Sequence, residues 1–216
     1  MSKESYFEDI VEINDLIPKR FQDHLSDSIM QPKFPWYFVR EVSAPYGAWK
    51  NNDLNKYDCE INDYSVSGFV HELWSKGNIE SSYFDTFSPI LYFLEDASNL
   101  QIEDLVEFRL NLFNRNANIV PHHIPHIDVP KNDVKLYTAL YYVNDSDGDT
   151  HFFKEFYDPS IKRFINGYSP DIFNLQTRVT PQKGKTILFD SRRYHASSYP
   201  EQTPERIVLN ITFTVK

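Results

Sequence analysis

From residue 105 onward the pattern of apolar and polar residues predicts several short strands. The segment 105–113 alternates strictly, as expected for a half-buried strand. Other segments are rich in β-branched and aromatic residues and are bounded by turns. Together the predicted strands cover 105–113, 135–144, 150–153, 178–180, 185–189 and 206–215. Short strands joined by turns are typical of a double-sheet jelly roll or a small barrel.

Helices are expected mainly in the first half. Pro18 suits the first turn of a helix over 19–28, where its missing N–H costs nothing. A second helix is predicted over 89–96, and a third short one starting near Gln101. Two strands are predicted in this half, over 34–39 and 66–74. The long loop between them, 43–63, is expected to be functional.

This order of elements predicts a mainly β fold of the α+β class. We expect a double-stranded β-helix, or jelly-roll, core with the N-terminal helices packed on one sheet. A chain of 216 residues fits one domain, and no linker divides it. We therefore expect a single domain over 1–216, in which 1–104 gives helical and strand support and 105–216 forms the jelly-roll core.

Composition narrows the class of protein. Apolar residues make up 41% and aromatic residues 16%, which favours a folded chain. The net charge is −9 and basic residues cluster only in pairs, which argues against nucleic acid as a partner. The single cysteine, Cys59, favours a reducing, cytoplasmic setting. The chain has neither an apolar signal-peptide core nor an apolar run long enough to span a membrane, so we expect no membrane association.

Three residues form a candidate metal site. His126 and Asp128 lie two apart, so on a strand their side chains point to the same face. His195, after a later strand, is the candidate third ligand. Two histidines and one carboxylate are the ligand set of non-haem iron(II) oxygenases. A His-x-Asp pair arises often by chance, and a zinc site of His122, His126 and His195 is an alternative.

In its motifs the chain resembles the 2-oxoglutarate- and iron(II)-dependent oxygenases, in the prolyl-4-hydroxylase-like branch. It looks particularly like the small members found in phages and marine bacteria, for which the compartment would be the host cytoplasm. The resemblance covers roughly residues 105–215 and rests on five segments. These are Arg109–Arg115, His126–Asp128, Thr138–Asn144, Gly148–Thr150 and 181–213.

The resemblance implies roles for individual residues. His126, Asp128 and His195 would hold the iron. Arg206 would bind the distal carboxylate of 2-oxoglutarate, for which a guanidinium is chemically suited. The implied cofactors are Fe(II), 2-oxoglutarate and O₂, and the catalytic part of the domain would be 105–216.

Two further residues match polar pocket positions of these oxygenases. The phenol of Tyr142 would also touch the distal carboxylate. Tyr141 and Tyr142 alternate faces, so only one can point inward, and we favour Tyr142. Asn111 would touch the cosubstrate or the substrate. Many relatives have two glycines before the threonine that corresponds to Thr150, whereas this chain has only Gly148 there.

The implied activity is that of a dioxygenase, most simply a hydroxylase. It would couple oxidation of a substrate C–H bond to decarboxylation of 2-oxoglutarate to succinate. Retention of Asp128 favours hydroxylation, because halogenating relatives lose that ligand. The substrate, a small molecule or a peptide, is unidentified, and the loops 43–63 and 154–176 are expected to shape its pocket. The alternatives are a non-enzymatic jelly-roll binding or structural module, and a cupin-like metalloenzyme that does not use 2-oxoglutarate.

Overall fold

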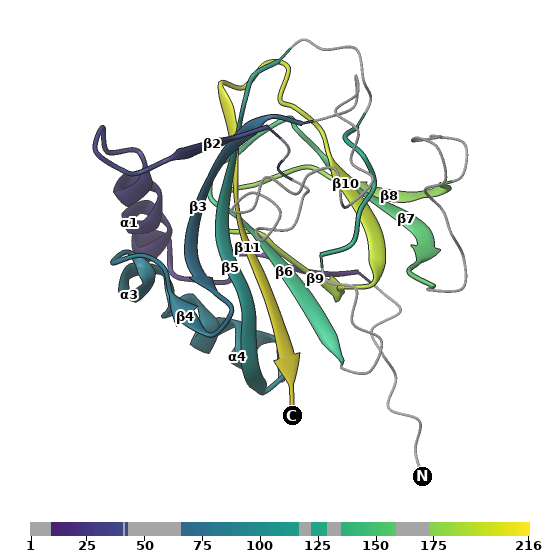
Figure 1. The fold of residues 1–216 in the computed structure, drawn as a ribbon, viewed down its shortest axis with the longest axis horizontal. Helices are drawn as coiled ribbons and strands as arrows, with labels where there is room; N and C mark the ends of the chain where they lie inside the picture. The colour runs from purple at the N-terminus through teal and green to yellow at the C-terminus, as the bar shows by residue number, and fades with distance from the viewer. Residues whose placement is uncertain (1–9, 41, 43–65, 117–121, 129–134, 159–172) are drawn as a thin grey trace.

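The computed structural model describes residues 10–40, 42, 66–116, 122–128, 135–158 and 173–216 (Figure 1). Within these ranges two antiparallel sheets face each other, and short helices lie beside the larger one. The helices are α1 (Lys19–Ile29), α3 (Phe84–Phe87) and α4 (Ile90–Ser98). The strands are β1 (Val11–Ile13), β2 (Tyr37–Val39), β3 (Gly68–Ser75), β4 (Asn78–Ile79), β5 (Ile102–Asn114), β6 (Leu136–Tyr142), β7 (Thr150–Phe156), β8 (Leu175–Val179), β9 (Thr186–Asp190), β10 (Arg193–Ser197) and β11 (Glu205–Val215).

The main sheet has the order β1-β9-β6-β11-β5-β3-β2, and β4 pairs with β3 at its edge. The two longest strands, β5 and β11, pair along most of their length, with Arg206 opposite Phe113 and Asn210 opposite Arg109. On its other side β11 pairs with β6, where Val208 lies opposite Tyr142. Since β11 is flanked on both sides, nearly all of its residues are buried.

The smaller sheet has the order β10-β7-β8 and covers one face of the main sheet (Figure 1). An apolar cluster fills the space between the sheets. It combines Phe152 of β7 and Val179 of β8 with Leu140, Ile187 and Val208 of the main sheet. These residues alternate with outward-facing neighbours along each strand, so one face of the main sheet lies inside the jelly roll.

The opposite face of the main sheet packs against the helices. Its apolar cluster joins Leu25 of α1 and Leu94 of α4 to Leu110 and Leu209 of the sheet. The helix α1 begins directly after Pro18, as the sequence predicted. The expected layer of N-terminal helices on one sheet is therefore confirmed, and so is the mainly β jelly-roll core.

The third predicted helix is wrong. Asn99 adopts a left-handed conformation, with φ of 55°, which ends α4. The backbone N–H of Ile102 then donates to the Glu95 carboxylate, and β5 begins at that residue rather than a helix near Gln101. The predicted strand 34–39 is also shorter, because only Tyr37–Val39 pairs.

Several expected features fall wholly or partly outside the described residues. The predicted loop 43–63 lies outside them, as does most of the second pocket loop, 159–172. Among the helices that are described, none combines the length and the apolar character needed to cross a bilayer.

Candidate metal centre and its pocket

The structure brings His126, Asp128 and His195 together. One potential ligand atom from each lies within 4.8 Å of the other two. The backbones of the two histidines form an antiparallel bridge, in which His126 N–H donates to His195 C=O at 2.9 Å and His195 N–H donates back at 3.0 Å. The bridge places the segment around His126 beside β10, so two histidines that are distant in the sequence become direct neighbours.

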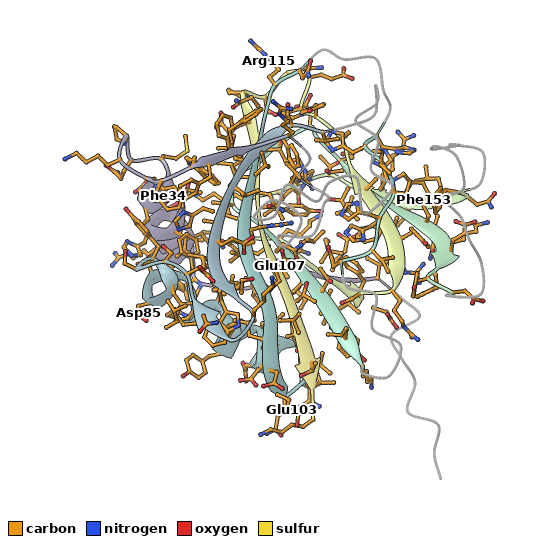
Figure 2. All side chains as sticks on the ribbon, viewed as in Figure 1. Phe34, Asp85, Glu103, Glu107, Arg115 and Phe153 are labelled. Atoms are coloured by element: carbon orange, nitrogen blue, oxygen red, sulfur yellow. The ribbon has the colours of Figure 1, made fainter. Side chains whose placement is uncertain are left out.

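One detail of the predicted geometry needs correction. Within the described residues 122–128, His126 and Asp128 do not lie on a regular strand, because His126 forms the one β-bridge there. The alternation of side chains nevertheless holds. Ile127 packs away from the site against the cluster of Phe153 and Tyr194, the former labelled in Figure 2 on the small sheet. His126 and Asp128 therefore both face the space between the sheets.

Backbone contacts fix the tautomers of the two histidines. His126 Nδ1 lies 3.1 Å from Ile124 O, and His195 Nδ1 lies 3.2 Å from Arg193 O. A carbonyl oxygen can only accept, so each Nδ1 carries the proton. In the neutral ring the lone pair is then on Nε2, as in metal-binding histidines whose other nitrogen donates to a carbonyl. Burial lowers the pKa of His126 to about 4, with His195 as a further cause, so its ring is neutral at pH 7.

Asp128 is held as a carboxylate. The Thr138 hydroxyl donates to Oδ2 at 2.6 Å and the Asn210 amide donates to Oδ1 at 3.3 Å. Burial alone would raise the pKa of Asp128, but the neighbouring histidines and these hydrogen bonds lower it below its ordinary value. Its Oδ1 lies 3.7 Å from His195 Nε2. Both atoms offer lone pairs, so the contact is not a hydrogen bond between neutral histidine and carboxylate.

Lone pairs from two imidazoles and one carboxylate thus converge in a buried space. A divalent metal placed there would be ligated by all three groups. The mixed nitrogen and oxygen donor set suits iron(II). In the part of the chain that the structure describes, no second group of three metal-capable side chains meets the same distance limit, and His122 does not belong to this one.

A pocket extends from the three residues along β11. Side chains of Arg206, Val208 and Asn210 follow one another on its inner face, as expected for every second residue of a strand. The other lining residues are Val42, Val66, Arg109, Asn111, Phe113, His123, His126, Leu140, Thr150, His195, Ala196 and Ser197. The lining thus includes two of the three metal-capable residues, His126 and His195. Arg109 lies opposite Asn210 in the register of β5 and β11, so Arg206 and Arg109 lie near opposite ends of this row.

Arg206 lies at one end, 3% exposed. Its Nε donates to Gly148 O at 2.7 Å and its Nη2 to Thr150 Oγ1 at 2.8 Å. The ion pairs among the described residues include none with Arg206. Among the described residues the carboxylate that acts on it, Asp149, lies beyond ion-pair distance, and a buried guanidinium of this kind favours an anionic ligand.

The single glycine before Thr150 is sufficient for this geometry. A Cβ on Gly148 would lie 2.7 Å from Ser198 O and 3.0 Å from Arg206 Cδ. Only glycine allows the loop to approach so closely, which lets the Gly148 carbonyl hold the guanidinium. The missing second glycine of the resemblance therefore does not prevent the turn.

Tyr142 points inward and Tyr141 outward, as predicted. Tyr142 belongs to the cluster between the sheets, and its hydroxyl donates to Thr150 Oγ1 at 2.7 Å. Tyr141 packs in the cluster beneath the helices. Burial raises the pKa of Tyr142 to about 12, so its phenol stays protonated. It does not line the pocket directly, and its contact with a carboxylate stays a prediction.

The second arginine, Arg109, is already neutralised. Its Nη1 lies 3.1 Å from Glu107 and 3.7 Å from Glu72, and all three side chains are largely buried. Figure 2 labels Glu107 on β5, near the middle of the main sheet. Asn111, two residues along the same strand, has an Oδ1 that is buried without a partner among the described residues. The end of the pocket at Arg206 is thus suited to an anion. The end at Arg109 and Asn111 is polar but closer to neutral.

The sequence assigned no role to the pocket residues Arg109, His123 and Asn210, or to Thr138, which donates to Asp128. Asn210 could have been found, because it lies on the same face of its strand as Arg206. The adjacent histidines His122 and His123 gave no such signal. In the structure His123 lines the pocket, whereas the half-buried His122 contacts His151.

Comparisons with known proteins rest on structure alone. No protein-family model matches the chain, and no curated protein matches it. A 2OG-Fe(II) oxygenase family oxidoreductase from Burkholderia pseudomallei aligns with a TM-score of 0.60 and 12% identity, over 95% of this chain and 84% of that one. The non-heme α-ketoglutarate-dependent carbocyclase SnoK from nogalamycin biosynthesis aligns at 0.57 and 12%, over 99% and 84%. A Pseudomonas putida prolyl-4-hydroxylase aligns at 0.50 and 13%, over 96% and 92%.

At such low identities the likeness concerns the fold. It extends over nearly the whole chain, including the helices that lie outside the motifs. The chain therefore has the jelly-roll fold of the 2-oxoglutarate- and iron(II)-dependent oxygenases.

Proposed function

We propose that the protein is an Fe(II)- and 2-oxoglutarate-dependent dioxygenase that hydroxylates a small molecule or a peptide. The observation that carries this proposal is the convergence of His126, Asp128 and His195 within 4.8 Å at the wall of a pocket that ends at Arg206. The shared fold of solved oxygenases supports it.

The chain's own residues would supply ligand geometry. The Nε2 atoms of His126 and His195 and one oxygen of Asp128 would bind iron(II). The carbonyls of Ile124 and Arg193 hold the imidazole rings in the required tautomer. Three ligands on one side leave the remaining positions open, and the bound iron would use them to activate O₂ with the keto acid.

Arg206 would orient the cosubstrate. Its guanidinium would pair with the distal carboxylate of 2-oxoglutarate, and the Thr150 hydroxyl, which accepts from Tyr142 and Arg206, keeps its own hydrogen free to donate. Val208 separates Arg206 from Asn210 on the inner face of β11, so an apolar surface faces the methylene groups. The pocket thereby matches a dicarboxylate with a charged end and a short apolar stem.

The substrate would approach from the Arg109 and Asn111 end. That end is polar but carries no free positive charge, because Glu72 and Glu107 neutralise the guanidinium. A group with both a hydrogen-bond donor and an acceptor, such as an amide, suits it better than a second carboxylate. Amides occur in peptides and in many small metabolites.

An anaerobic titration tests the proposed function. Adding iron(II) and then 2-oxoglutarate to the metal-free protein should produce the weak visible charge-transfer band of a keto acid chelated to iron. We expect no band in Asp128→Ala, because one of the three ligands is lost. Folded, iron-loaded wild-type protein that develops no band would contradict the proposal.

The same assay separates the cupin-like alternative. In an enzyme that does not use 2-oxoglutarate, Arg206→Ala would leave iron binding and turnover unchanged. If Arg206 binds the keto acid, the substitution should keep iron affinity but raise the concentration of 2-oxoglutarate needed for the band at least tenfold, as expected for loss of a charge-assisted pair. A non-enzymatic module would bind neither ligand and would release no succinate.

A further inference from the structure

His123 has a buried nitrogen that nothing in the described part of the chain satisfies. The residue is 3% exposed, and its Nε2 has no hydrogen-bond partner among the described residues. The side chain lines the same pocket as Arg206 and His126, and the charge of Arg206 acts on its ring. A buried polar atom without a partner is destabilising, so its position at a pocket wall favours a ligand that pairs with it.

Contacts with Ser197, Phe113 and Tyr199 hold the ring of His123 in place. Its backbone N–H donates to Ser197 O at 2.7 Å, and its Nδ1 lies 2.9 Å from Ser197 Oγ. Phe113 and Tyr199 pack against it, with ring centroids 5.1 and 4.5 Å away. The imidazole therefore cannot swing out of the pocket wall without breaking these contacts, and Nε2 is the ring nitrogen that they leave without a partner among the described residues.

Ser197 leaves the tautomer of His123 adjustable. A hydroxyl can donate as well as accept, unlike the carbonyls beside His126 and His195. When Ser197 donates to Nδ1, the proton of the neutral imidazole moves to Nε2, which becomes a donor. Burial, reinforced by Arg206, lowers the pKa of His123 well below its ordinary value. The ring thus offers a neutral N–H in the same pocket as the Arg206 guanidinium.

We propose that the Nε2–H of His123 donates a hydrogen bond to the distal carboxylate of the keto diacid, beside Arg206, and that Ser197 is the positioning residue that fixes this tautomer. The inference rests on the proposed function, because it concerns the cosubstrate of that reaction.

The contacts of Arg206 explain why this residue alone would not satisfy both oxygens of the distal carboxylate. Its Nε is committed to Gly148 O and its Nη2 to Thr150 Oγ1. A carboxylate has two oxygens and about four acceptor directions. In a buried site each unfilled direction is costly, so neutral donors such as His123 and Thr150 are needed to complete the shell. A neutral donor satisfies the carboxylate without adding a second positive charge beside the guanidinium.

A titration with two keto acids tests this assignment. Anaerobic iron(II) protein is titrated with 2-oxoglutarate and with 2-oxopentanoate, which has a methyl group in place of the distal carboxylate, and the charge-transfer band gives each dissociation constant. In His123→Leu we expect 2-oxoglutarate to bind about 10- to 100-fold more weakly, the loss of one hydrogen bond to a charged group. Binding of 2-oxopentanoate should change less than about twofold.

Three further variants test the assignment even if His123→Leu folds poorly. His123→Gln places an amide nitrogen near the Nε2 position and should retain most of the 2-oxoglutarate affinity. His123→Asn is polar but too short to reach that position, so it should resemble His123→Leu. Ser197→Ala should weaken 2-oxoglutarate selectively, because the donor that sets the tautomer is lost.

The outcomes distinguish this inference from the proposed function. Equal weakening of both keto acids, or no weakening in His123→Leu and His123→Asn, would overturn the role of His123 while leaving the oxygenase proposal intact. Absence of the band in the wild-type protein would overturn the proposed function itself. Selective loss of 2-oxoglutarate, with rescue by His123→Gln, would support the assignment.

Discussion

The carboxylate of Asp128 depends on a short chain of hydroxyl groups. Thr138 has one hydroxyl hydrogen, which it donates to Asp128 at 2.6 Å. Ser191 Oγ lies 2.9 Å from the Thr138 oxygen, so the Ser191 hydroxyl must be the donor in that contact. The Asn210 amide holds the other carboxylate oxygen. Thr138 and Asn210 thereby orient the Asp128 carboxylate so that its Oδ1 faces His195. Contacts that orient a metal ligand in this way strongly affect metal affinity.

Replacing Thr138 by valine should weaken the metal site without disturbing the fold. Valine has nearly the same shape, so Thr138→Val removes the hydrogen bond to Asp128 and little else. We expect iron(II) to bind about 10- to 100-fold more weakly, the usual effect of losing a contact that supports a metal ligand. Competition with a chelator of known affinity measures the change.

Thr212→Val is the matched control. Thr212 is equally buried and lies opposite Thr138 on β11, but the described contacts of its hydroxyl do not include Asp128. Its iron(II) affinity should stay close to that of the wild-type protein. Equal weakening in the two variants would show that burial of a hydroxyl, rather than the contact with Asp128, governs the affinity.

At the scale of elements, residue alternation made the strands and their inward faces predictable. It identified β5 and required Tyr141 and Tyr142 to face opposite sides, while the resemblance favoured Tyr142 as the inward one, as observed. Alternation says nothing about pairs that meet only through tertiary contact. The single bridge between His126 and His195 and the inward turn of His123 depend on the packing of β10, so neither could be read from local pattern. The helix expected near Gln101 failed because one left-handed residue, Asn99, redirects the chain.

The loop between β6 and β7 is held to the chain before β11 by one carboxylate. Asp147 accepts hydrogen bonds from the backbone N–H groups of Glu201, Gln202 and Thr203, and from the Thr203 hydroxyl. Burial alone would raise the pKa of Asp147, but these bonds lower it to about 2. Since Gly148 follows directly, this junction also sets the position of the carbonyl that holds Arg206.

Substituting Asp147 by alanine should destabilise the protein in a pH-dependent way. We expect a loss of about 1–2 kcal/mol at pH 7, modest because the carboxylate is partly exposed to solvent. The pKa is lower in the folded than in the unfolded protein, so this contribution is complete above about pH 4 and is lost as the pH falls toward 2. Denaturant unfolding of both proteins at pH 7, 5, 4 and 3 measures it.

Asp145→Ala serves as the control for that loop. Among the described residues the Asp145 carboxylate accepts one backbone hydrogen bond, from Lys183, and the residue is exposed. Its loss should cost less at every pH. A difference between wild type and Asp147→Ala that grows rather than shrinks below pH 4 would contradict the assigned direction of the pKa shift.

For the whole molecule, the two faces of the main sheet divide stability from chemistry. The outer face packs against α1 and α4 (Figure 1). It holds the larger apolar cluster, which contains none of the pocket residues. The inner face carries both pocket arginines and faces the metal-capable residues and Phe152 of the smaller sheet. Each strand of the sheet contributes to both faces, so a stable outer layer fixes the backbone on which the site is built.

Truncation of the outer cluster should therefore reduce stability while leaving the site unaltered. Leu94 of α4 is fully buried there, so Leu94→Ala should cost about 2–5 kcal/mol in the free energy of unfolding. Well below its unfolding temperature, the variant should bind iron(II) and 2-oxoglutarate within about twofold of wild type. Val208→Ala, on the inner face, should instead weaken 2-oxoglutarate binding, because Val208 lines the pocket between Arg206 and Asn210. Weaker ligand binding in folded Leu94→Ala would mean that the helix layer sets the geometry of the site directly, and the separation of the two faces would then be wrong.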